Sequence, residues 1–306
     1  MISHKPIAEA AGMGKMGLHR NVIHPKFGNF ILLGTVLIDA KVTEEAKSLD
    51  YNPCLDCKLC VAACPVGAIG EDGHFDFTAC YTHNYREFLG GFSDWVGIVA
   101  DAGSAEDYRA KVTEGETVSL WQSLSFGPNY KAANCLSVCP AGEDIIGPFL
   151  KSRKTHVAEV LRPLQENTES VYVLSGSDAA DYVARKYPHK TRRFVGSTNQ
   201  PKTLAALWIL MPHGFQRHKA KGLAAIFHFT FFGKEKGEKT IVIENGHIAL
   251  ADGHHGIPSV KIRADSATWL RIPTGKMHPV RAVLTRKLRV RGDIRLLQKF
   301  SACFAH

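Results

Sequence analysis

The cysteines constrain this chain more than any other feature, because seven of the eight fall between Cys54 and Cys139. Four form one run with the spacing Cys-x2-Cys-x2-Cys-x3-Cys: Cys54, Cys57, Cys60 and Cys64. The N-terminal residues carry no apolar signal-peptide core, and dense cysteines in a chain without such a signal indicate metal ligands or redox groups instead of disulfides. A zinc site would need its ligands in two separated pairs, which one run does not supply. The first half is therefore predicted to fold around bound metal.

The run, with Pro65 directly after it, is the signature of bacterial two-cluster ferredoxins. In such proteins the first three thiolates hold one [4Fe–4S] cluster, and the fourth cysteine is a ligand of the other. A return motif is also present, since Cys135 and Cys139-Pro140 repeat the Cys-x3-Cys-Pro ending. Crossed ligation predicts a first cluster held by Cys54, Cys57, Cys60 and Cys139, and a second held by Cys64, Cys80 and Cys135. These seven cysteines are the predicted metal and cofactor ligands, and electron transfer is the predicted chemistry.

The second cluster lacks one evident thiolate. A complete second run would place a cysteine three residues before Cys135, where the sequence has Ala132. Either the cluster is [3Fe–4S], or one iron of a [4Fe–4S] cluster is held by water, a substrate or another side chain. Sequence proximity makes His74, His83 and Asn134 candidates, and an ordinary loop or surface role is the alternative for each. The sequence identifies no catalytic acid or base.

The segment from Pro6 to Pro140 resembles the iron–sulfur half of the epoxyqueuosine reductase and corrinoid reductive dehalogenase superfamily. The resemblance is carried by Ala8 to Gly17, Asn21 to Asp39, the first cysteine run, Cys80, and Cys135 with Cys139-Pro140. It supports Cys80 as a cluster ligand, because those enzymes place a cysteine at about this distance after the first Cys-Pro. It also implies a corrinoid near Gly12 to Gly17 as a further cofactor. Members of that superfamily carry a sizeable domain before the segment that matches Ala8 to Gly17. For a corrinoid-dependent reaction, a partner chain is expected to supply that domain here.

The second half has a different pattern. Residues 146–199 are expected to be a connector with a short helix, strand and helix, and the polar run at 196–201 is the clearest boundary. A small α/β module follows, in which Asn245-Gly246 between two apolar runs predicts a β-hairpin. The remaining predicted elements are helices at 203–211, 266–270, 280–286 and 293–304 and strands at 225–232, 260–264 and 288–290. Cys303, in the last apolar stretch, is predicted to be a buried structural thiol.

Residues 201–304 resemble the sterol-carrier-protein domain in the order of these elements and in the stretch from Leu284 to Asp293. The resemblance implies a sheet and helices around an apolar tunnel for a lipid or acyl ligand. Alternation places Phe227, Phe229 and Phe231 on one face of a strand. They are expected either to line such a tunnel or to form an ordinary packed core.

The predicted fold class is α+β: a ferredoxin-like two-cluster iron–sulfur domain at 1–145, the connector at 146–199, and a sterol-carrier-type domain at 200–306. No apolar run is long enough to span a membrane, and a cytoplasmic location is expected. The net charge of +9 favours an acidic partner, which is a redox protein, nucleic acid or anionic lipid.

Three functions fit these features. The first is an electron-transfer protein or reductase component that passes electrons to a partner or to a substrate held by the C-terminal domain. The second is a corrinoid-dependent reductase that needs a partner chain. The third is a lipid-binding module whose clusters are structural or oxygen-sensing.

Overall fold

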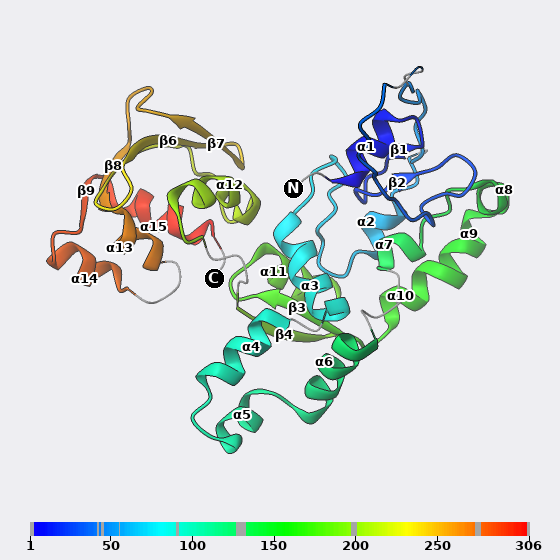
Figure 1. Cartoon of the computed structure of the whole chain (residues 1–306), viewed down its shortest axis with the longest axis horizontal. Coiled ribbons are helices and arrows are strands. Elements are labelled where there is room, and N and C mark those ends of the chain that lie inside the picture. The colour runs from blue at the N-terminus through cyan, green and yellow to red at the C-terminus, as the bar shows by residue number, and fades with distance from the viewer. Residues whose placement is uncertain are drawn as a thin grey trace.

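The protein combines a helix-rich N-terminal part with a C-terminal part built on one sheet, as the computed structural model shows (Figure 1). The structure describes residues 3–41, 43, 46–54, 56–89, 92–126, 133–196, 201–272 and 277–304. Ala132, where a further cysteine would stand, lies outside these residues. The mixture of separate helical and sheet regions is an α+β fold, as predicted.

The N-terminal part consists of short elements joined by long loops. In chain order they are α1 (His4–Ala10), β1 (Lys15–Met16), β2 (Val22–Ile23), α2 (Leu59–Ala63), α3 (Phe77–Leu89), α4 (Phe92–Asp101), α5 (Ala105–Lys111), α6 (Glu114–Phe126) and α7 (Asn134–Ser137). α2 is a short helix inside the first cysteine run, and Cys64 is its C-cap residue.

The expected connector is more regular than predicted. Its elements, together with the helix that leads into it, are α8 (Glu143–Lys151), α9 (Arg153–His156), the π-helical turn η1 (Val157–Leu161), α10 (Arg162–Glu166), β3 (Ser170–Leu174), α11 (Asp178–Lys186) and β4 (Thr191–Val195). Ser177 caps α11, since its hydroxyl accepts a hydrogen bond from the Ala180 amide. β3 and β4 pair in parallel, so β3, α11 and β4 form a small βαβ unit that the sequence analysis did not identify.

This βαβ unit shares one hydrophobic core with the cysteine-bearing loop. Val171, Val173 and Val183 are fully buried and pack in the same cluster as Leu59, which lies within the first cysteine run, and Val66, which follows it. Apolar burial of this kind is the main stabilising term in folding. The βαβ unit therefore supports the cysteine loops directly.

The C-terminal part is a five-stranded sheet with the order β7-β6-β5-β8-β9, covered by helices (Figure 1). Its elements are α12 (Leu204–Gly214), β5 (Ala225–Phe232), β6 (Gly237–Glu244), β7 (His247–Asp252), β8 (Val260–Asp265), α13 (Ser266–Arg271), α14 (Pro279–Leu284), β9 (Leu288–Gly292) and α15 (Ile294–Ala302). β6 and β7 form the predicted hairpin, and Asn245 and Gly246 at its turn have φ values of 52° and 71°. Two consecutive positive φ values are what a type I′ turn requires.

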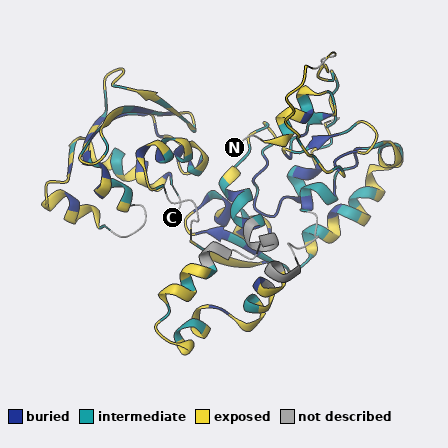
Figure 2. Cartoon of the chain, in the orientation of Figure 1, coloured by how far each residue is buried: buried dark blue, intermediate teal, exposed yellow. Residues whose placement is uncertain are grey.

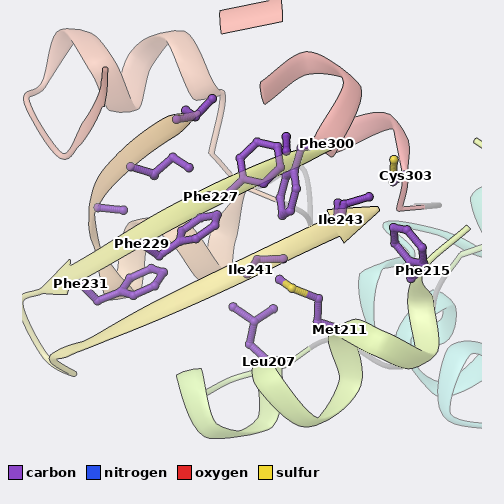
Figure 3. Packing of buried hydrophobic residues seen from close by; sticks show 14 of the residues in the cluster. Leu207, Met211, Phe215, Phe227, Phe229, Phe231, Ile241, Ile243, Phe300 and Cys303 are labelled. Atoms are coloured by element: carbon purple, nitrogen blue, oxygen red, sulfur yellow. The ribbon is translucent and has the colours of Figure 1, made fainter. Parts of the chain in front are cut away.

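The aromatic face of β5 forms a packed core (Figures 2 and 3). Phe227 and Phe229 are fully buried, and the ring of Phe229 lies 5.2 Å from that of Trp269 and 5.8 Å from that of Phe300, centroid to centroid. Cys303 is fully buried beside them, as predicted, and its thiol donates to the Lys299 carbonyl. Of the two roles expected for the phenylalanines, the structure shows the packed core. A separate cavity of about 280 Å³ lies beside Phe231 and Trp208.

The two parts of the chain dock through specific polar contacts. The Thr78 hydroxyl on α3 donates to the carbonyl of His213 on α12 over 2.5 Å. The Asp178 amide at the start of α11 donates to the side-chain carbonyl of Gln216, which is 1% exposed. Arg217 adds an ion pair of 2.9 Å with Asp72. The buried contact at Gln216 fixes where α12 lies against the iron–sulfur part.

The ion pair predicts a pH dependence at this interface. The Arg217 side chain, by its hydrogen bond, lowers the pKa of Asp72 from about 4 to about 2. Because the pKa of Asp72 is lower in the folded protein, its ionised carboxylate contributes fully to the free energy of unfolding above about pH 4. That contribution is lost as the pH falls towards 2. The carboxylate is largely exposed, so solvent screening keeps the contribution small. In Arg217→Ala the pKa of Asp72, followed by NMR titration, is expected to return towards 4. An unchanged titration curve would contradict the ion pair.

Candidate iron–sulfur site

The first cysteine loop turns tightly around a small cavity. The Cys57 amide donates to the Cys54 carbonyl over 2.9 Å, and Asp56 and Lys58 on either side of Cys57 have positive φ values of 53° and 50°. Left-handed backbone at two non-glycine residues is uncommon and needs support from the surrounding structure. The loop brings successive thiols to one side of the chain before α2 begins.

Four of the predicted ligands meet at this cavity. Its volume is about 20 Å³, and its wall includes Cys54, Cys57, Cys60 and Cys139. Cys139 comes from the turn after α7, far along the chain, and apolar side chains of Leu59, Ile146 and Phe149 complete the wall. These are the four cysteines that crossed ligation assigns to the first cluster.

The other three predicted ligands line a second, much larger cavity. Its volume is about 860 Å³, and its wall includes Cys64 from the end of α2, Cys80 from α3 and Cys135 from α7. Cys80 is thus brought from a separate helix to the same cavity as Cys64. The seven cysteines divide four and three between the two cavities.

The side chains proposed as further ligands lie in different places. His83 and Asn134 line the large cavity, whereas His74 is not part of its wall. The Nδ1 atom of His83 accepts a hydrogen bond of 3.4 Å from the Tyr172 amide, which leaves the proton on Nε2. The Asn134 amide group donates to Glu169. In this orientation His83 offers no unoccupied nitrogen lone pair, whereas Asn134 could reach an iron only through its side-chain carbonyl oxygen.

Sequence reasoning missed several residues of the large cavity. Lys5, His19 and Arg20 come from the N-terminal segment, and His213 comes from α12 in the C-terminal part. No local signal marked them, because a histidine or lysine outside a metal motif is usually an ordinary surface residue. His213 shows that the C-terminal part forms one wall of this cavity.

N–H groups donate to three of the cysteine sulfurs. The Leu18 amide lies 3.4 Å from Cys54 Sγ, the Ala68 amide 3.3 Å from Cys64 Sγ, and the Asn84 side-chain amide 3.1 Å from Cys80 Sγ. Hydrogen bonds to sulfur are one of the means by which proteins set the reduction potential of iron–sulfur clusters.

The surroundings of three of the thiols disfavour the ionised form when no metal is bound. Burial, with the neighbouring thiols as a further cause, raises the pKa of Cys60 and of Cys135 to about 12 and that of Cys80 to about 11. A bound metal reverses this preference, because a coordinating thiol is deprotonated outright. Buried sulfurs with few carboxylates beside them are the donor set that suits iron–sulfur clusters.

Within the described ranges, no three His, Cys, Asp or Glu side chains converge on the position of a single metal ion. A cubane makes a different demand, because its cysteines surround a cage and each of its irons takes one thiolate. The residues around both cavities fit that arrangement.

Comparison with known proteins agrees with this geometry. A 4Fe-4S binding domain matches residues 48–70, and the SCP-2 sterol transfer family matches residues 214–305. The chain is 30% identical over 89 residues to the epoxyqueuosine reductase of Vibrio cholerae, covering 29% of this chain and 24% of that protein. The corresponding enzyme of Bacillus anthracis is 29% identical over 186 residues, covering 58% of this chain and 41% of that protein. The chain thus spans less than half the length of these relatives.

Among solved structures, the apo form of sterol carrier protein 2 from Yarrowia lipolytica is similar to part of the chain. It has 18% sequence identity and a TM-score of 0.24, and the match covers 27% of this chain and 73% of that one. The matches give the order of the segments along the chain: an iron–sulfur segment similar to that of epoxyqueuosine reductases precedes a segment that matches the SCP-2 sterol transfer family.

No helix in the described part of the chain has the length and apolar character needed to cross a membrane.

Proposed function

We propose that this chain, with its 4Fe-4S binding segment and its SCP-2 domain, is the iron–sulfur component of a reductase. The division of the seven cysteines between two cavities carries the proposal. Cys54, Cys57, Cys60 and Cys139 would hold one [4Fe–4S] cluster. Cys64, Cys80 and Cys135 would hold a second cluster, one iron of which has no cysteine ligand. When bound, such clusters supply one-electron transfer.

The large cavity is the proposed substrate site. It adjoins the three-cysteine cluster site, and its volume of about 860 Å³ suits a small organic molecule. Lys5 and Arg20 place positive charge in its wall, which offsets the negative charge of thiolate-bound iron. The backbone carbonyl of Arg20 accepts a hydrogen bond of 2.8 Å from Lys5 Nζ and so orients that ammonium group.

The C-terminal domain would supply the substrate or hold part of it. His213 places this domain at the cavity wall, and the match to the SCP-2 sterol transfer family favours a lipid or acyl group as ligand. The separate 280 Å³ cavity has Trp208 and Phe231 on one side and charged residues such as Glu235 and Lys239 on the other, so its wall alone does not favour an acyl chain. We propose a domain boundary near residue 199, with residues 1–145 and the segment 146–199 supporting the cysteine loops.

Electrons would come from a low-potential one-electron donor protein. The net charge of +9 favours a donor with an acidic surface. All eight cysteines are free thiols, which fits a reducing compartment, and we propose the cytoplasm.

Metal analysis with electron paramagnetic resonance (EPR) tests the proposal. Anaerobically purified protein is expected to contain about seven to eight irons per chain, because two cluster sites are encoded. Mild oxidation should release the iron that lacks a thiolate and produce the signal of an oxidised three-iron cluster. Ala132→Cys, which restores the missing cysteine of the motif, is expected to suppress that signal.

Three results would oppose the proposal. Stoichiometric zinc with little iron would exclude clusters as the resident cofactors. Two indistinguishable, fully ligated [4Fe–4S] clusters would show that an unidentified residue completes the second one. Stoichiometric cobalt with the visible bands of a corrinoid would favour instead a corrinoid-dependent reductase that works with a partner chain.

A further inference from the structure

A tight turn places His19 between the two cysteine sites. The Gly17 amide donates to the Asn21 carbonyl, and the Arg20 amide donates to the Gly17 carbonyl, each over 2.9 Å. The turn packs closely at Gly17, because a Cβ at this position would lie 2.6 Å from Ile23 Cδ1 and 3.1 Å from His19 Cε1. The His19 ring lines both the small cavity and the large one.

The hydrogen bonds of the His19 ring determine where its proton lies. Nδ1 accepts a hydrogen bond of 3.1 Å from the Asn21 amide, so the neutral ring carries its proton on Nε2. In this tautomer the ring presents a neutral N–H donor at Nε2.

Among the residues that the structure describes, that donor has no hydrogen-bond partner. His19 is 5% exposed, and its Nε2 atom is fully buried without a hydrogen-bond partner in the described part of the chain. A buried donor left unsatisfied costs about 1–3 kcal/mol, so such groups are rare unless they face a ligand. The acceptors that belong beside this ring are the sulfurs of a bound cluster.

We infer that His19 Nε2–H donates a hydrogen bond to a sulfur of the second cluster and raises its reduction potential. The large cavity favours that site, because His19 lines it together with Cys64, Cys80 and Cys135, and the ammonium-bearing Lys5 lies in the same wall. Reduction adds negative charge to the cluster and strengthens such a bond, so the reduced state is stabilised. His19 is thus a positioning residue, and it cannot serve as the missing iron ligand while Nδ1 accepts from Asn21.

The inference rests on the proposed function, and its test separates the two. The full chain is titrated with a reductant under anaerobic conditions, and the potential of each cluster is read by EPR in His19→Leu, His19→Gln and His24→Leu. Leucine removes the donor, whereas the glutamine amide can still donate from nearly the Nε2 position. His24 is a matched control, because its Nδ1 also accepts a backbone amide, that of Lys26 over 3.0 Å, but its ring lines neither cavity.

His19→Leu is expected to lower the equilibrium constant for reduction of the second cluster about tenfold. For a one-electron couple this is a fall of about 59 mV in its reduction potential. The second-cluster potential of His19→Gln should lie close to that of the unmodified protein, and that of His24→Leu should be unchanged. An unchanged second-cluster potential in His19→Leu would overturn the inference, as would a shift confined to the four-thiolate cluster. Absence of clusters from the unmodified protein would instead overturn the proposed function.

A second measurement does not depend on His19→Leu and covers the case in which that variant does not fold. Protein labelled with ¹⁵N-histidine is reduced, and pulsed EPR is used to detect weak coupling between a histidine nitrogen and the second cluster. A coupling that disappears in His19→Gln supports the assignment. No histidine coupling in the labelled, cluster-loaded protein contradicts it.

Discussion

Cys57→Ser is expected to remove the four-thiolate cluster and about half of the iron, with a large loss of stability in the N-terminal part. Cys57 lies in the tight loop beside two left-handed residues, and it lines the small cavity with Cys54, Cys60 and Cys139. The energy of binding the cluster is part of the folding energy, since the site does not exist in the unfolded chain. Iron and sulfide quantitation with EPR would show which cluster remains.

Two matched variants make this experiment specific. Cys80→Ser is expected to remove the other cluster and spare the four-thiolate one, because Cys80 lines only the large cavity. Cys303→Ser should retain both clusters, since that thiol is buried in the C-terminal core. Retention of both clusters in Cys57→Ser, or loss of both in Cys303→Ser, would contradict the ligand assignment.

Phe229→Ala is expected to destabilise the C-terminal domain by about 3–5 kcal/mol, because it leaves a cavity where a fully buried ring packs against Trp208, Trp269 and Phe300. Thermal or urea unfolding followed by tryptophan fluorescence would measure the change. Trp208 and Trp269, which both pack against the ring, make the signal sensitive to this core.

Phe30→Ala is the control for that substitution. Phe30 is 59% exposed, so removal of its ring should change the free energy of unfolding by no more than about 0.5 kcal/mol. The iron content of Phe229→Ala is expected to stay normal, because the two hydrophobic cores contain different residues. An effect of Phe229→Ala no larger than that of Phe30→Ala would show that this face is not a packed core.

The elements that sequence patterns predicted well are those defined by neighbours along the chain. The hairpin at Asn245-Gly246 is one, because positive φ at two adjacent residues suits these residue types. The helix capped by Asp265 is another, since its carboxylate accepts from the Thr268 amide three residues later. The apolar spacing from 149 to 167 suits a single helix, but the structure has several pieces there, and Ser152 ends α8 and caps α9.

Local spacing was sufficient to identify the iron–sulfur chemistry, because three thiols within seven residues can reach one cluster without help from the rest of the chain. Only the tertiary structure determined which other residues lie around the predicted cluster sites. It brought Cys80 and Cys135 to the cavity of Cys64, buried His19 between the two sites, and set His213 of the C-terminal part in the cavity wall. These residues lie far apart in sequence, and only the packing of α2, α3, α7 and α12 makes them neighbours, so no local pattern records their proximity.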